Sequence, residues 1–289
     1  MAAIRPRRSV LYMPGANERA MEKARSLPCD TIIFDLEDAV AVAAKDSARN
    51  AVCRAVTEGD YGYRELVVRV NGLDTEWGSK DVAAAAKLDV DALLFPKVES
   101  AEQVAAIVRE LDGAGGQQLP IWLMIETPKG VLDVRTVAAC SQRVACLVMG
   151  TSDLVKELRA AHTEDRQNIG YALQHCVLVA RELGLDVLDG VHLDFRNLES
   201  FAQTCQQARL MGFDGKTLIH PGQVEIANQS FGFDDEAIAD ARAVIEVWQE
   251  ASAAGKGVAV LEGRLIENLH AAQAERVLAF ADALAARGS

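Results

Sequence analysis

The chain has 289 residues, half of them hydrophobic and a quarter charged, and it carries a formal net charge of −12. Such a chain can bury a large core as one large domain or two small ones, and its acidic surface excludes nucleic acid and anionic membranes as general partners. No apolar run approaches the ~20 residues that span a bilayer, and the first ten residues lack the pattern of a signal peptide, so we expect a cytoplasmic protein.

Short apolar strands alternate with longer helical patterns over the first 225 residues. Because the strands are too apolar to alternate, they indicate a parallel sheet buried on both faces. Eight strands with intervening helices predict a closed TIM (β/α)₈ barrel, whose typical length is ~250 residues. An open doubly wound sheet is the alternative, but no Gly-x-Gly-x-x-Gly follows the first strand. The strands are predicted at 10–13, 31–35, 66–70, 92–95, 121–125, 146–149, 187–191 and 215–219.

The pattern changes after the eighth strand, so we divide the chain into a barrel over 1–225 and a C-terminal helical extension over 226–289. Two helical stretches, 234–254 and 266–286, flank a glycine-rich joint at 255–263. An extension of this kind could cap the barrel mouth or pack on a neighbouring subunit. A plain packing appendage is the alternative.

Carboxylates follow several strands at their C-terminal ends. Glu126 ends the fifth strand and Asp153 follows the sixth, whereas Asp35, Glu37 and Asp38 end or follow the second. In a barrel these acids converge on one face and repel one another, a conflict that a divalent cation resolves. Oxygen ligands without a nearby His or Cys suit Mg²⁺ or Mn²⁺, which keep several waters.

We therefore predict Glu126 and Asp153 as direct metal ligands. Glu37 and Asp38 would hold metal-bound waters or act as acid/base groups. Each acid also has a structural interpretation, because Asp153 could cap a helix and at least one acid after the second strand could be a cap or a salt-bridge partner.

Two cations belong to the same set of strand ends. Arg69 lies inside an apolar strand, where an unpaired charge is costly, so it should pair with inward carboxylates or with a substrate carboxylate or enolate. Lys97 follows the fourth strand and could form a Schiff base, as in metal-independent aldolases. That alternative leaves the acidic cluster unexplained.

The N-terminal segment and the first helix hold the best local basic cluster of this acidic chain. These cations could meet the phosphates of a nucleotide-tailed substrate, or they could be ordinary solvated charges. The cluster comprises Arg5, Arg7, Arg8, Lys23 and Arg25.

The motifs named above together resemble the citrate lyase β-subunit family, which includes malyl-CoA, methylmalyl-CoA and citramalyl-CoA lyases. The resemblance covers essentially the whole chain, and its motifs run in the order of the family. The matching stretches are 8–15, 34–40, 68–72, 95–100, 124–128, 150–153 and 215–221.

The resemblance implies a TIM barrel, usually trimeric, that uses Mg²⁺ to cleave or form the carbon–carbon bond of a malyl-, citramalyl- or citryl-CoA thioester through an acyl-CoA enolate. It implies that Glu126 and Asp153 bind Mg²⁺ and that Arg69 faces the thioester carbonyl and its enolate. Glu37 and Asp38 would order the waters of the metal. The implied partners are a coenzyme A thioester, a 2-oxo acid and further copies of the chain, as a trimer or hexamer. The residues expected to bind substrate or coenzyme A are Arg8, Lys23, Arg69 and Glu126.

One position departs from the family pattern. Lyases of the family offer an Asp from the C-terminal segment across the subunit interface as acid/base, and Glu267 stands at that place. Glu reaches about one methylene further, and misplacement by ~1 Å can cost on the order of 10²-fold in rate. Hydrolysis of malyl-CoA or a related thioester on the same scaffold is therefore an alternative to the lyase reaction. A further alternative is a complex-dependent subunit that acts only on an acyl-carrier protein.

Overall fold

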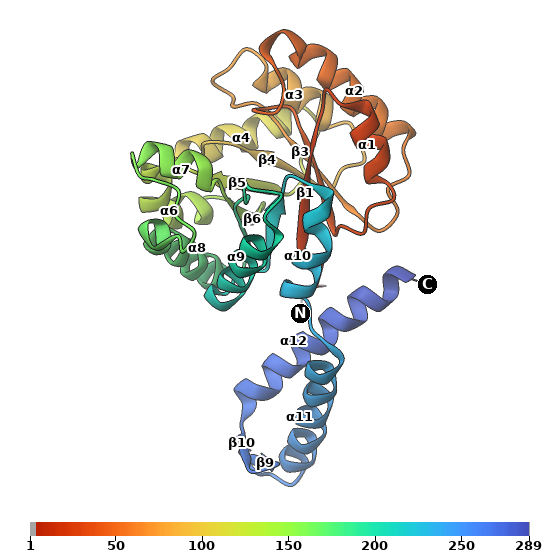
Figure 1. Cartoon of the computed structure of the whole chain (residues 1–289), viewed down its shortest axis with the longest axis vertical. Helices are drawn as coiled ribbons and strands as arrows, with labels where there is room; N and C mark the ends of the chain where they lie inside the picture. Colours follow the sequence, from red (N-terminus) through yellow and green to blue (C-terminus); the bar gives the residue numbers. More distant parts are fainter. Residues whose placement is uncertain (1–3, 289) are drawn as a thin grey trace. The chain divides into compact units, whose positions relative to one another are not determined.

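The structure is a computed structural model that describes residues 4–288 (Figure 1). The chain forms two compact units, Arg7–Phe231 in one and Met1–Pro6 with Gly232–Ser289 in the other. The helix α10 (Val224–Phe231) packs on β1, β8 and α9. It therefore belongs to the first unit, and the division falls after Phe231 rather than after residue 225.

The first unit contains the predicted TIM barrel. Eight parallel strands close in sequence order, and β8 pairs with β1. Most strand residues are buried, because helices cover the outside and side chains fill the inside. The strands are β1 (Ser9–Pro14), β2 (Thr31–Asp35), β3 (Glu65–Arg69), β4 (Ala92–Phe95), β5 (Ile121–Ile125), β6 (Val144–Met149), β7 (Asp186–Asp189) and β8 (Gly215–Leu218).

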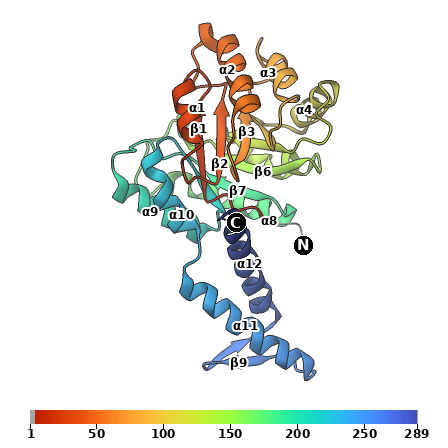
Figure 2. The same ribbon diagram turned by 90° about the vertical axis from the view of Figure 1, so that its right-hand side faces the viewer.

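Helices connect successive strands and surround the barrel (Figures 1 and 2). The helix α4 illustrates why they form. Ser100 and Gln103 make a capping box at its start, and Val104, Ile107 and Leu111 place an apolar stripe on the buried face. The helices of this unit are α1 (Glu18–Ala24), α2 (Lys45–Glu58), α3 (Gly78–Ala85), α4 (Ala101–Gly113), α5 (Pro128–Leu132), α6 (Val134–Ala139), α7 (Thr151–Glu157), α8 (Gly170–Leu183), α9 (Leu198–Met211) and α10.

The barrel interior is closed at the N-terminal ends of the strands. The Arg7 guanidinium lies 5.0 Å from the ring centroid of Trp122 and donates to Glu65 at 2.6 and 2.7 Å. Above this pair, inward side chains of several strands form an apolar cluster that includes Ile33 and Leu94. Open space in the barrel is therefore left to the C-terminal ends of the strands.

Closure of the barrel between β8 and β1 depends on a glycine. A Cβ atom at Gly215 would collide with the carbonyl oxygen of Arg7, so we expect Gly215→Ala to lower the free energy of unfolding by about 1–3 kcal/mol through overpacking. Chemical denaturation measures the change. Gly113→Ala is the matched control, because its Cβ would meet no atom within 4 Å, and this variant should be neutral or slightly stabilising. Equal stability of the two variants would contradict the expectation.

The second unit contains the predicted helical extension, with two helices and a β-hairpin: α11 (Asp235–Ala253), β9 (Ala259–Leu261), β10 (Arg264–Ile266) and α12 (Asn268–Ala285) (Figure 2). The hairpin turns at Glu262 and Gly263, whose φ angles are 49° and 81°, and two positive φ angles suit a two-residue hairpin turn. The sequence predicted only a glycine-rich joint at 255–263, whereas the structure places β9 and the turn of the hairpin within this segment. No helix within residues 4–288 is both long and apolar enough to cross a membrane.

Candidate functional site

A cavity of about 400 Å³ opens at the C-terminal ends of the barrel strands. Arg69 at the end of β3, Glu126 after β5 and Asp153 in α7 all line it, together with Asp38. Strand-end residues predicted from four separate parts of the sequence therefore share one cavity. Glu37 lines a neighbouring cavity of about 500 Å³, and Asp38 lines both.

Local sequence explains why Glu126 sits at the mouth. Thr127 caps α5 by accepting from the backbone of Gly130 at 3.0 Å, and Pro128 occupies the first turn, so the chain turns into a helix directly after Glu126. A Cβ atom at Gly150 would lie 2.5 Å from the Oε2 atom of Glu126. Glycine at that position therefore makes room for the carboxylate.

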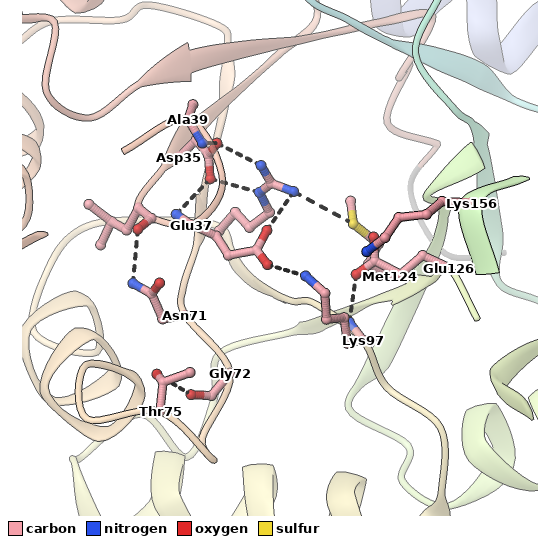
Figure 3. A network of polar contacts seen from close by, with 12 residues as sticks. Asp35, Glu37, Ala39, Asn71, Gly72, Thr75, Lys97, Met124, Glu126 and Lys156 are labelled. Carbon is pink, nitrogen blue, oxygen red and sulfur yellow. Dashed lines mark hydrogen bonds and ion pairs between the residues drawn. The ribbon is translucent and has the colours of Figure 1, made fainter. Parts of the chain in front are cut away.

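The Glu126 side chain is only 2% exposed. The backbone N–H of Lys97 donates to its Oε1 at 2.7 Å (Figure 3), and the φ angle of Lys97 is 51°, a left-handed conformation that costs a lysine free energy. Burial raises the pKa of Glu126 to about 8; the charges of Glu37 and Asp153 also raise it, and Lys97 opposes the rise. The positive charge of Lys97 is therefore too small to offset the effect of burial on the Glu126 carboxylate.

Arg69 is held by a buried ion pair with Asp35, the structural alternative considered for its strand position. Its Nε and Nη2 atoms donate to the two Asp35 oxygens at 2.7 and 2.6 Å, and its Nη1 lies 2.9 Å from Oε2 of Glu37. Asp35 also accepts from the backbone of Glu37 and Ala39 (Figure 3). Asp35 thus holds the start of the loop after β2 against β3.

Glu37 lies between two cations. Its Oε1 accepts from Nζ of Lys97 at 2.6 Å (Figure 3), while its other oxygen faces Arg69. Burial lowers the pKa of Lys97, but the hydrogen bond and charge of Glu37 outweigh burial, and the net pKa is raised above the ordinary value. A firmly protonated amine is a poor nucleophile, so this geometry argues against the Schiff-base alternative for Lys97.

Lys45, which the sequence does not distinguish from a solvated helix lysine, anchors the loop that carries Glu37. Its buried Nζ donates to the carbonyl oxygens of Leu36 and Glu37 at 2.8 Å each and to Oδ1 of Asn71 at 2.7 Å. These bonds restrict the backbone on either side of Glu37. Only the fold reveals this role, because the acceptors come from two separate strand ends.

Asp153 does not cap a helix. The helix α7 begins at Thr151 with Gly150 at the N-cap position, so Asp153 lies within the first turn. Its side chain is half-buried on the cavity wall. This position leaves its carboxylate available to a ligand of the cavity.

Besides Glu37, three predicted residues are not among those that line the cavity. Arg8 precedes β1 and lies at its opposite end, where it donates to both oxygens of the buried Asp30 at 2.9 Å. Its place in the expected binding set is corrected for this reason. Lys23 is exposed in the last turn of α1. Glu267 precedes α12 in the second unit, where its backbone N–H donates to Nδ1 of His270 at 3.0 Å.

The donors around the cavity fit a hard divalent cation. Within the part of the chain that the structure describes, no group of three or more His, Cys, Asp or Glu side chains could hold a metal. Mg²⁺, however, is commonly bound through only one or two carboxylates with waters and substrate completing the shell. Glu126 and Asp153 line the same cavity, and a cation there would offset the burial, and the charges of Glu37 and Asp153, that raise the pKa of Glu126.

Comparisons with known proteins give consistent findings. A family model described as HpcH/HpaI aldolase/citrate lyase matches residues 8–221. The chain is 48% identical over 284 residues to a (3S)-malyl-CoA thioesterase of Cereibacter sphaeroides (strain KD131 / KCTC 12085), covering 97% of this chain and 96% of the relative. It is 33% identical over 285 residues to a citrate lyase subunit beta of Leuconostoc mesenteroides subsp. cremoris, covering 96% and 94%. The solved structure of CitE from Mycobacterium tuberculosis in complex with magnesium, acetoacetate and coenzyme A is similar with a TM-score of 0.77 and 27% identity, covering 98% of this chain and 100% of that one.

Proposed function

The chain belongs to the HpcH/HpaI aldolase/citrate lyase family, and from this premise we propose that it is an Mg²⁺-dependent enzyme that hydrolyses a malyl-CoA-type thioester to the free acid and coenzyme A. The observation that carries the proposal is the cavity at the barrel mouth that Arg69, Glu126 and Asp153 line together. The substrate class is supported by four relatives named (3S)-malyl-CoA thioesterase that are 46–48% identical to the chain.

Carbon–carbon cleavage of the same thioester is the second candidate function. Relatives named citrate lyase subunit beta support it, at 32–34% identity over 90–96% of the chain. Both reactions begin with the same groups, since each needs the acid end of the substrate bound and negative charge on the thioester oxygen stabilised. They differ in the bond that breaks: hydrolysis breaks the carbon–sulfur bond with water as the nucleophile, whereas the lyase reaction breaks a carbon–carbon bond.

In this proposal the chain contributes binding and charge. Glu126 and Asp153 would hold Mg²⁺, which supplies Lewis-acid polarisation of the substrate oxygens that it chelates. The backbone N–H of Lys97 keeps the Glu126 carboxylate in place. Arg69, fixed by Asp35, presents a positive charge to the thioester oxygen as negative charge develops there.

Hydrolysis also needs an acceptor for the proton of the attacking water. Asp38 is exposed and lines the cavity, and its side chain makes no ion pair or hydrogen bond with any residue of 4–288. An unpaired carboxylate at the mouth can accept this proton while the thiolate of coenzyme A leaves. Glu37, engaged by Arg69 and Lys97, is the better group for orienting water than for accepting its proton.

Glu267 remains our predicted second acid/base group, supplied by a neighbouring copy in a homo-oligomer such as a trimer. Its extra methylene relative to the family Asp alters the distance to the reacting carbon. This difference supports hydrolysis over carbon–carbon cleavage, because a retro-aldol step needs the base to meet one hydroxyl proton in a fixed position, whereas water can adjust its own.

The products distinguish the reactions. We expect the purified chain, incubated with (3S)-malyl-CoA and Mg²⁺, to release malate and coenzyme A in equal amounts by mass spectrometry, and to stop when the metal is chelated. If the products were instead acetyl-CoA and glyoxylate, the chain would be a lyase and not a thioesterase. Turnover of an acylated carrier protein alone would favour the complex-dependent subunit.

The same assay tests Glu267. We expect Glu267→Gln to lower turnover by about 10²-fold or more, as for loss of a general acid/base group, with unchanged Mg²⁺ affinity. Glu275→Gln is the matched control, because Glu275 is an exposed residue of the same helix. Equal turnover of the two variants would remove Glu267 from the mechanism.

A further inference from the structure

One polar group of the cavity has no role in the mechanism above, the phenol of Tyr12. Tyr12 lies in the middle of β1, where its ring packs against the apolar cluster inside the barrel. It also lines the cavity beside Arg69 and Glu126. Its neighbours in sequence are apolar, so the strand pattern gives no reason to separate it from a core residue.

The donors of Arg69 are largely committed to the protein. A guanidinium carries five N–H donors, and those of Nε and Nη2 reach Asp35 at 2.7 and 2.6 Å. The Nη1 atom lies 2.9 Å from Oε2 of Glu37 and 3.7 Å from the sulfur of Met124. Arg69 can therefore supply positive charge to a ligand, but few of its hydrogens are left to bond a substrate oxygen.

The Tyr12 hydroxyl is in the opposite situation. Within residues 4–288 no side chain or backbone group hydrogen-bonds to it, and its oxygen is not sealed from solvent. The oxygen therefore opens to the cavity that the residue lines. A mostly buried Tyr hydroxyl usually finds a partner, so this hydroxyl is placed to bond a molecule that enters the cavity.

The surroundings keep this hydroxyl a donor. Burial raises the pKa of Tyr12 well above its ordinary value; Arg69 lowers it in part, and the charges of Asp35 and Glu126 raise it again. The phenol is therefore protonated at neutral pH. The Arg69 guanidinium lies 4.8 Å from the ring centroid, so the charge of Arg69 lies close to the phenol.

We propose that Tyr12 donates a hydrogen bond to the carbonyl oxygen of the bound thioester, beside the positive charge of Arg69. The inference rests on the proposed function for the identity of the substrate. The thioester oxygen is the substrate atom that gains negative charge in hydrolysis and in carbon–carbon cleavage, and it lies at the end of the substrate opposite to the acid that Glu126 and Asp153 would bind through the metal. Tyr12 makes no proton transfer; it strengthens a hydrogen bond as charge develops.

The variant Tyr12→Phe tests the inference, because it keeps the ring beneath Arg69 and removes only the hydroxyl. We expect kcat to fall by about 10²-fold, the effect of losing one donor to a developing oxyanion, while Mg²⁺ affinity and the denaturation midpoint stay unchanged. Tyr61→Phe is the matched control. Tyr61 is a buried tyrosine whose hydroxyl donates to the carbonyl oxygen of Met21, and this variant should keep the wild-type kcat.

Binding of two unreactive analogues locates the contact without turnover. In a dethia analogue of malyl-CoA a methylene replaces sulfur and the carbonyl stays, whereas an alkyl thioether analogue lacks the carbonyl. Tyr12→Phe should weaken the dethia analogue by up to about tenfold, as for one lost hydrogen bond, and leave thioether binding unchanged. If Tyr12→Phe kept the wild-type kcat and the wild-type affinity for the dethia analogue, the inference about Tyr12 would be wrong and the proposed function would stand. If the wild-type chain neither bound nor converted malyl-CoA, the proposed function would be wrong as well.

Discussion

Glu126→Gln and Asp153→Asn are each expected to weaken Mg²⁺ binding by about 100-fold or more in isothermal titration calorimetry, and to abolish turnover in parallel. Loss of groups that only support metal ligands already costs 10–100-fold in affinity, and these two carboxylates would be direct ligands. An amide cannot supply the negative charge that a cation needs, whereas the buried Glu126, whose pKa is raised to about 8 by burial, gains most from a cation beside its carboxylate.

Two further variants sharpen this result. Asp89→Asn removes an exposed carboxylate that precedes β4, at the opposite end of the barrel, and should leave Mg²⁺ affinity unchanged. Gly150→Ala adds no charge, but its Cβ would collide with Glu126. This variant should therefore lower the Mg²⁺ affinity as well. Wild-type affinity in Glu126→Gln or Asp153→Asn would show that the corresponding carboxylate is not a ligand.

Arg69→Met is expected to lower the free energy of unfolding by about 3–5 kcal/mol and to eliminate activity. Removing one partner of a buried ion pair leaves the other charge without compensation, and Asp35 is only 1% exposed. Glu37 loses a cation in the same variant, although Lys97 still donates to it. Urea denaturation measures the stability, and the product assay measures the activity.

The double variant Asp35→Asn with Arg69→Met separates stability from catalysis. Because neither charge remains, its stability should recover much of the loss seen in Arg69→Met, while its activity stays absent. Asp35→Asn alone completes the double-mutant cycle. Strictly additive stability changes across the cycle would contradict a direct Arg69–Asp35 pair, and recovered activity in the double variant would contradict a charge role for Arg69.

The sequence by itself determined the barrel and the location of the main acids. Eight apolar strands without alternation require a sheet covered on both faces, and in a parallel barrel the C-terminal ends of all strands meet at one end. Glu126 and Asp153, each following a strand, were therefore bound to reach one region whatever the details of packing. The metal chemistry inferred from them depends on residue type and strand polarity, and both can be read from the sequence.

The tertiary structure decided which charges pair. Asp35 and Arg69 are 34 residues apart, and Glu37 and Lys97 are 60 apart. The strand pattern alone permits several partners for each, because side-chain direction and loop conformation select among them. Lys97 adopts a left-handed conformation that turns its N–H to Glu126. The sequence around Lys97 does not predict this conformation.

Arg8 and Tyr12 also show what the sequence cannot predict: it suggested a binding role for Arg8 and none for Tyr12. Arg8 belongs to a visible basic cluster, but β1 carries the chain from Asp30 at one end of the barrel to the cavity at the other. Tyr12 looks like one more apolar strand residue, and only its inward position beneath Arg69 exposes an unpaired hydroxyl to the cavity. Composition and spacing determine which groups a chain has and at which end of the fold they lie, whereas hydrogen-bond partners are settled by three-dimensional packing, because a buried polar group is satisfied by whichever atoms the fold brings to it.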